Sequence, residues 1–161
     1  MPDPDGGANL LVAADDGSHA LRVQLSPLPD TAWRRLDDRH RAQARHVTWL
    51  YGPAAGAAAA TEAAVRGVSF EVRRHSLGLA VGVRDVDDRT RWVRLAACRL
   101  TADDFDVPGT EPARALHARR TAEREEAARR MGQQAARRSR AGERAAGTRW
   151  GPTPSPLPFP G

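Results

Sequence analysis

Apolar and polar residues alternate with a period of two along the stretch from Val68 to Leu100. Such alternation is typical of strands with one buried face. Polar breaks at residues 74–77 and 86–89 divide the stretch into three segments, which predicts an antiparallel three-stranded meander. The inward positions carry apolar side chains, many of them β-branched: Val68, Phe70, Val72, Leu79, Val81, Val83, Val93 and Leu95.

The register of this meander depends on the length of its second turn. A slip of one residue would move every side chain to the opposite face, and a three-residue turn over 86–88 keeps the apolar residues together. Asp88, at the third position of this turn, tolerates the left-handed conformation that such a turn requires. The expected cross-strand pairs are Val81 with Val93, Leu79 with Leu95, and Gly82 with Trp92.

The residues before the meander predict a hairpin, a helix, a strand and a second helix. Two apolar runs, 9–14 and 19–26, form the hairpin. A period near 3.6 predicts a helix over 31–44 with Asp30 as N-cap, and a helix-favouring Ala-rich run over 53–66 ends at Gly67. The helix over 31–44 has an apolar face of Trp33, Leu36 and His40, and a solvent face of Arg34, Arg35, Asp37, Asp38 and Arg41. The strand over 46–51 places Val47, Trp49 and Tyr51 on one side.

This order predicts an α+β core domain over 9–107, with a mostly antiparallel sheet (β-β-α-β-α-β-β-β) and two helices on one face. We expect the helices on the side of Leu79, Val81 and Val83, because the other face is rich in Arg. Residues 1–8 are expected to form a disordered leader. Residues 111–146 predict an Arg-rich solvated helix that frays after Gly132, and residues 147–161 predict a disordered Pro-rich tail, which could dock into a groove of a partner.

Charge is unevenly placed along the chain. Residues 1–111 contain 14 Arg against 16 Asp plus Glu, whereas residues 112–161 contain 11 Arg against 4 Glu. The absence of Lys excludes a phosphate-binding GK[ST] loop and Schiff-base chemistry. Cys98 is the only cysteine, so we expect no disulfide, no thiolate zinc site and a reducing cytoplasm. The longest uncharged stretch, 47–61, is too short to span a bilayer, and we expect a soluble protein that binds no membrane and no cofactor.

The first candidate site is the second face of the meander. An aromatic ring among guanidinium groups is how single-stranded nucleic acid is held. The alternative is a solvated face on which an Arg stacks on Trp92 while Trp92 covers Gly82. The residues of this face are Arg73, Arg84, Trp92 and Arg94, with Arg22 if its strand joins the same sheet.

The second candidate site is the basic C-terminal region, which would bind phosphates with a strong salt dependence. The alternative is a soluble Arg-rich tail without a ligand. Its basic residues are Arg129, Arg130, Arg137, Arg138, Arg140, Arg144 and Arg149.

Two weaker candidates complete the set. Acidic residues at 103–111 could hold Mg²⁺ or Ca²⁺, although Thr101 to Asp104 also resembles a capping box that opens a helical turn. A dyad of Cys98 with His75 is the second. No motif identifies a metal site or a catalytic residue. We expect a non-enzymatic binding or adaptor module whose basic tail contacts nucleic acid or an acidic partner. The alternatives are an accessory subunit of an assembly and a small metal-dependent hydrolase using Asp103, Asp104, Asp106 and Glu111.

Overall fold

The computed structural model describes residues 7–14, 17–101 and 104–147. Residues 1–6 of the leader predicted over 1–8, and residues 148–161 of the tail predicted over 147–161, lie outside the described residues. Residues 7 and 8 belong to the first strand instead, and Gly147 is the last residue of the last helix. The strands are β1 Gly7–Ala14, β2 Gly17–Gln24, β3 His46–Tyr51, β4 Val68–His75, β5 Gly78–Asp85, β6 Thr90–Arg94, β7 Arg99–Leu100 and β8 Phe105–Asp106. The helices are α1 Asp30–Gln43, α2 Gly56–Arg66 and α3 Thr110–Gly147, with short 3-10 turns at Pro53–Ala55 and Leu95–Ala97.

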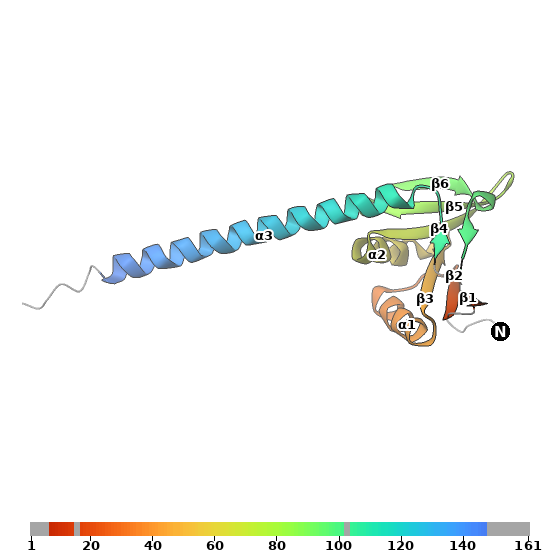
Figure 1. The fold of residues 1–161 in the computed structure, drawn as a ribbon, viewed down its shortest axis with the longest axis horizontal. Coiled ribbons are helices and arrows are strands. Elements are labelled where there is room, and N and C mark those ends of the chain that lie inside the picture. The colour runs from red at the N-terminus through yellow and green to blue at the C-terminus, as the bar shows by residue number, and fades with distance from the viewer. Residues whose placement is uncertain (1–6, 15–16, 102–103, 148–161) are drawn as a thin grey trace, which may run out of the picture. The chain divides into compact units, whose positions relative to one another are not determined.

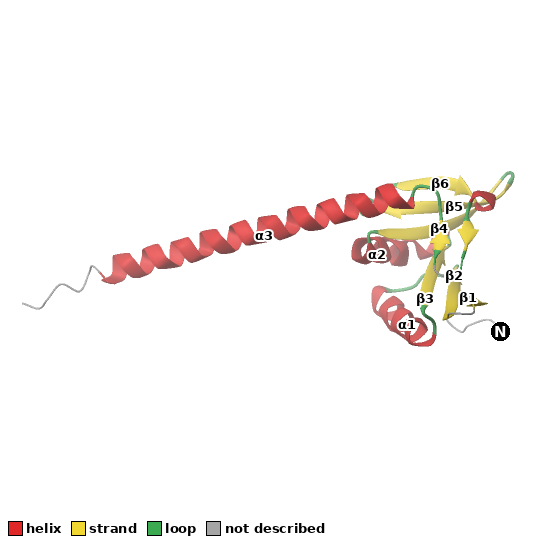
Figure 2. Ribbon diagram, viewed as in Figure 1, coloured by secondary structure: helices red, strands yellow, loops and turns green. Residues whose placement is uncertain are grey.

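One mixed sheet in the order β1-β2-β3-β4-β5-β6 forms the centre of the fold (Figure 1). The α+β class expected from the sequence is confirmed. The sheet is less antiparallel than expected, because β2 pairs with β3 and β3 with β4 in parallel. A helix connects the two strands of each parallel pair. Such a helical crossover lets the second strand run in the same direction as the first. β7 and β8 form a separate two-stranded ribbon (Figure 2).

The meander is built as its alternation predicts. Val81 lies opposite Val93, and Gly82 lies opposite Trp92. The turn over 86–88 is closed by a hydrogen bond from the Asp85 amide to the Arg89 carbonyl, and Asp88 has a φ of 65°. The third expected pair, Leu79 with Leu95, does not form, because Leu95 begins a 3-10 turn after β6 ends at Arg94.

The side of the sheet that carries α1 and α2 differs from the expectation. Both helices pack against Val47, Trp49 and Tyr51 of β3, in a core with Trp33 and Leu36. The large apolar side chains of β3 decide the helix side, and the arginines of that face are accommodated by ion pairs and hydrogen bonds. The Val81 side is covered instead by chain after β6, and its core includes Leu50, Phe70, Val81, Val83, Phe105, Val107 and Ala113.

Two helix ends can be compared with the capping predictions. Gly67 follows α2 with a φ of 87°, as its predicted C′ role requires. The predicted N-cap of α1 is wrong by one residue: Pro29 occupies the cap, and the Asp30 carboxylate accepts a hydrogen bond from the Thr61 hydroxyl at 2.6 Å.

The chain divides into two compact units, residues 1–120 and residues 121–161. The helical turn predicted after Thr101 includes residues 102 and 103, which lie outside the described residues. The Asp104 amide still donates to the Thr101 hydroxyl, at 3.0 Å, as in the predicted cap. The Arg-rich helix expected over 111–146 is α3, which continues through Gly132 to Gly147. Fraying after Gly132 stays a prediction.

Candidate functional site

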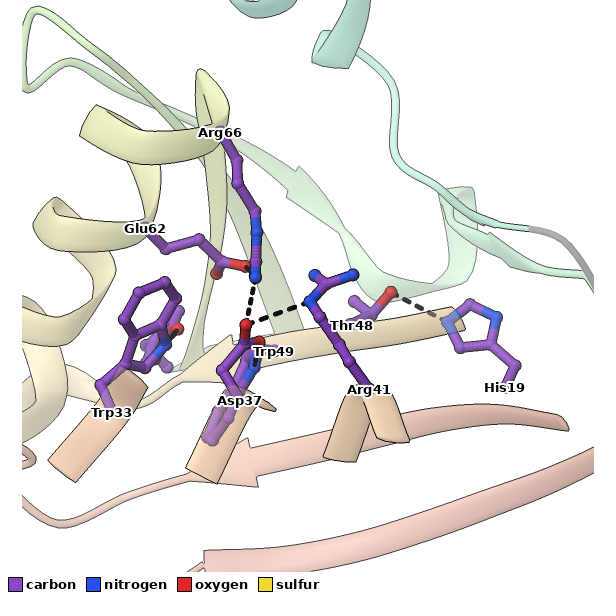
Figure 3. A network of polar contacts seen from close by, with 9 residues as sticks. His19, Trp33, Asp37, Arg41, Thr48, Trp49, Glu62 and Arg66 are labelled. Atoms are coloured by element: carbon purple, nitrogen blue, oxygen red, sulfur yellow. Dashed lines mark hydrogen bonds and ion pairs between the residues drawn. The ribbon is translucent and has the colours of Figure 1, made fainter. Parts of the chain in front are cut away.

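Asp37 is the centre of a buried polar network between α1, α2 and β3 (Figure 3). The sequence placed Asp37 on the solvent face of α1, but the residue is only 4% exposed. Its carboxylate accepts hydrogen bonds from Trp49 Nε1 at 2.9 Å and from Arg41 Nε at 3.0 Å, and it forms an ion pair with Arg66. One side chain of α1 therefore joins β3 and α2.

Arg66 links Asp37 to a second buried carboxylate, Glu62. The Arg66 guanidinium donates to Glu62 Oε1 at 2.6 Å and lies 5.2 Å above the centre of the Trp33 ring. Trp33 Nε1 in turn donates to the Tyr51 hydroxyl at 2.6 Å. Because Glu62 is one turn before Arg66 on α2, the pair has the favourable i, i+4 orientation.

The pKa values of the acidic groups of this network are shifted in different directions. Burial raises the pKa of Asp37, but hydrogen bonds from Arg66 and Trp49 outweigh it and lower the pKa below its ordinary value. Burial raises the pKa of Glu62 to about 7 despite the neighbouring Arg66. It also raises the pKa of Tyr51, so the phenol stays neutral. Glu62 Oε2 has no hydrogen-bond partner among the described residues.

The network continues along β2 and β3. His19 Nδ1 donates to the Thr101 carbonyl at 3.2 Å, because a carbonyl can only accept, and His19 Nε2 lies 2.9 Å from the Thr48 hydroxyl. Arg22 is 1% exposed and lies 3.0 Å from His40 Nε2, with its guanidinium 5.1 Å above the Trp49 ring. Buried polar groups of this kind are stable only when they are paired.

A polar pocket of about 160 Å³ opens beside this network. Its wall includes Thr48, Trp49, Glu62 and Arg66 from the core. The charged side chains of its lining are Arg41, Glu62, Arg66, Asp104 and Arg114, and each of them is already engaged in an ion pair. We read the network as the structural centre that positions α1 and α2. The sequence signals were the spacing of Asp37 and Arg41 and the pair Glu62 and Arg66 in an otherwise Ala-rich helix.

Glu62→Gln is expected to change how stability depends on pH. The folded-state pKa of Glu62, about 7, lies above its ordinary value of 4.5, so its contribution to stability is present below pH 4.5 and is lost as the pH rises through 7. The loss amounts to about 3 kcal/mol. Urea unfolding at several pH values should show a weaker decline for the variant than for the wild type.

The control for this experiment is Glu125→Gln on the exposed surface of α3. This change should leave the pH dependence as it is in the wild type. A Glu62→Gln protein with the same decline as the wild type would show that Glu62 is already ionised in the folded state at pH 5.

The structure brings together only some residues of the predicted aromatic and basic face. Arg73 lies on Trp92, 3.7 Å from the ring centre, and a Cβ on Gly82 would meet the Trp92 ring at 3.1 Å. Arg73, Trp92 and Arg94 share a pocket of about 200 Å³. Arg84 does not line that pocket: its guanidinium pairs with Glu71 and Asp88. Arg22 lies in the core.

Acidic residues of the candidate metal site at 103–111 form ion pairs in the structure. Asp104 and Glu111 both pair with Arg114, at 3.4 and 3.3 Å, while Phe105 is buried between the acids. Asp103 lies outside the described residues. Among described residues, no group of three His, Cys, Asp or Glu side chains is placed to hold a metal ion. Cys98 and His75 line two different pockets, Cys98 an apolar one and His75 that of Trp92.

The second half of α3 carries a line of arginines. Residues 122–144 are all exposed. Arg130, Arg137 and Arg144 are seven residues apart, so they lie almost in line along the helix at about 100° per residue. Other arginines lie to either side of this line, with Arg129 and Arg138 about 180° apart around the helix axis. The whole set is called the basic stripe: Arg129, Arg130, Arg137, Arg138, Arg140 and Arg144.

The basic stripe has few acidic neighbours. Arg130 pairs with Glu126 at 2.5 Å, and both side chains are more than half exposed. In the part of the chain that the structure describes, no ion pair engages Arg129, Arg137 or Arg138, and none engages Arg140. Glu143 is the one acidic residue between positions 127 and 147. The stripe is therefore an accessible line of positive charge.

Comparison with protein-family models, with curated proteins and with solved structures gave no match for this chain. Within the described residues, no helix combines the length and the apolar character needed to cross a membrane.

Proposed function

We propose that this protein is a non-enzymatic cytoplasmic binding module that contacts the phosphates of nucleic acid through the basic stripe of α3. The observation that supports this proposal most directly is the in-line spacing of Arg130, Arg137 and Arg144 on the exposed segment 122–144 of α3. The spacing places positive charge along about 21 Å of helix. A line of cations on one helix face is the usual electrostatic footprint of nucleic-acid binding.

An acidic protein surface is a less suitable partner for the same stripe. Stable protein interfaces have a desolvated core rich in aromatic and other apolar residues. From Ala122 to Arg144 the helix has one large apolar side chain, Met131, which is 70% exposed. Binding by this surface would thus be electrostatic and insensitive to base sequence.

The direct test is fluorescence anisotropy of a labelled single-stranded oligonucleotide titrated with the full-length protein at two salt concentrations. The proposal expects binding that weakens steeply as salt rises, since bound arginines release counterions. A polyglutamate competitor tests the acidic-protein alternative. Oligonucleotide binding that does not change with salt, or no binding at low salt, would contradict the proposal.

Trp92→Ala separates the stripe from the sheet face. We expect the oligonucleotide affinity to change by less than about twofold, because Arg73 already covers the exposed face of the Trp92 ring, and base stacking needs an open ring. Anisotropy titrations of the variant and the wild type at equal salt provide the measurement. A loss of affinity of tenfold or more would move the binding site from α3 to the sheet.

The accessory-subunit alternative relies on a different observation, the exposed leucines of the first unit. Leu77 is 72% exposed and Leu79 is 46% exposed, both next to the turn between β4 and β5. A co-purifying protein in fixed stoichiometry would favour this alternative over nucleic-acid binding. The metal-dependent hydrolase has no comparable support, since the Arg114 pairs already engage Asp104 and Glu111.

A further inference from the structure

An apolar cavity of about 440 Å³ lies on the face of the sheet opposite α1 and α2. Strands β2, β3, β4 and β5 form one wall, and the chain from the 3-10 turn after β6 to β8 forms the other. The volume lies within the range of small-molecule sites in proteins. The lining residues are Leu21, Val23, Leu50, Val72, Leu79, Leu95, Cys98, Leu100 and Phe105.

This space is called the apolar cavity. Its lining contains no charged side chain. Its single polar side-chain group is the Cys98 thiol, which already donates to the Arg94 carbonyl at 3.7 Å. A buried water needs two to four polar partners, and cavities lined by aliphatic and aromatic side chains stay dry and take up apolar molecules. The cavity is thus poorly suited to water and well suited to hydrocarbon.

The depth of the cavity also favours a ligand that enters. Leu50 and Phe105 at its base are 6% and 4% exposed, whereas Leu79 and Leu95 at its rim are 46% and 37% exposed. A ligand that fills the space would remove the rim leucines from water, and the burial of apolar surface is favourable.

A hydrocarbon chain fits this space better than a polypeptide does. A partner helix, about 10 Å wide, would need an open groove rather than a cavity with two walls. An extended peptide would bring amide groups that need hydrogen-bond partners. The lining side chains offer no partner except the Cys98 thiol, which already donates a hydrogen bond. A flexible alkyl chain has no such requirement.

We propose that the apolar cavity binds the hydrocarbon chain of a small molecule, such as an alkyl or acyl chain, between the sheet and the β7–β8 ribbon. The site is independent of the basic stripe, so it stands or falls separately from nucleic-acid binding.

Cys98 makes the site directly testable, because it is the only cysteine and it lines the apolar cavity. The probes are octanol, decanol and dodecanol added to the full-length protein, with the rate of maleimide labelling at Cys98 followed by mass spectrometry. We expect saturable protection, with labelling slowed about tenfold, and a rise in melting temperature with alcohol concentration. Decanoate in parallel shows whether a carboxylate head group is accepted.

The matched pair of variants is Leu79→Glu and Leu77→Glu. Both leucines are exposed and flank the same turn, but only Leu79 lines the apolar cavity. Leu79→Glu should abolish the protection by decanol, and Leu77→Glu should leave it unchanged. Circular dichroism of each variant verifies the fold.

Three outcomes would overturn the proposal. One is labelling of Cys98 in the wild type that none of the alcohols slows. Another is equal loss of protection in both variants, which would indicate a general effect of the alcohols. The third is protection that depends on protein concentration without ligand, which would identify a second copy of the chain as the occupant.

Discussion

Asp37→Ala is expected to lower the free energy of unfolding by about 3–5 kcal/mol, the range for removing one partner of a buried ion pair. The carboxylate accepts hydrogen bonds from Trp49 and Arg41 and pairs with Arg66. Its removal leaves the indole N–H of a fully buried Trp49 without an acceptor, and leaves Arg66 with Glu62 as its carboxylate partner. Urea unfolding followed by tryptophan fluorescence measures the loss, since Trp33 and Trp49 are both buried.

The adjacent residue supplies the control. Asp38 is exposed on the same helix, so Asp38→Ala should change the free energy of unfolding by less than about 0.5 kcal/mol. A similar small change for Asp37→Ala would show that the network does not hold α1 to β3 and α2.

The effect of Asp37 should also depend on pH. Its folded-state pKa lies below the ordinary value of 3.8, so its stabilising contribution is present above pH 3.8 and is lost as the pH falls through the folded-state pKa. The difference between the wild type and Asp37→Ala should accordingly shrink in acid. The stabilising contribution of Glu62 depends on pH in the opposite direction, because its folded-state pKa is raised.

Replacing Arg130, Arg137 and Arg144 together by Gln is expected to weaken oligonucleotide binding about 10- to 100-fold at low salt. Each phosphate contact on a single strand contributes about 0.7 to the slope of log K against log salt, so the slope should fall by about 2. Salt titrations of anisotropy measure both quantities. Gln keeps the helix propensity close to that of Arg, so α3 should remain helical.

The control variant removes the same charge from the first unit. Arg34, Arg35 and Arg39 are exposed on α1, and their joint replacement by Gln should leave the salt slope unchanged. Equal losses in both triple variants would mean that net charge, rather than the line of arginines on α3, determines binding.

The local features of this protein follow from local sequence. Val81 and Val93 face each other because alternation and a three-residue turn allow no other register without exposing apolar residues. Gly67 ends α2 because a left-handed residue is required there. The basic stripe can be read from the spacing of Arg130, Arg137 and Arg144, since helical periodicity alone places them in line.

The sequence by itself determined the α+β class, the meander register, the end of α2 at Gly67 and the position of the basic stripe, because each depends on residues close together in the chain. Tertiary structure alone decided the parallel pairing of β2, β3 and β4, the side of the sheet that carries the helices, and the burial of Asp37 and Glu62. Local periodicity predicts that a carboxylate faces the solvent. Asp37 is buried because Trp49 and Arg66, both more than ten positions away, supply the donors that make its burial favourable.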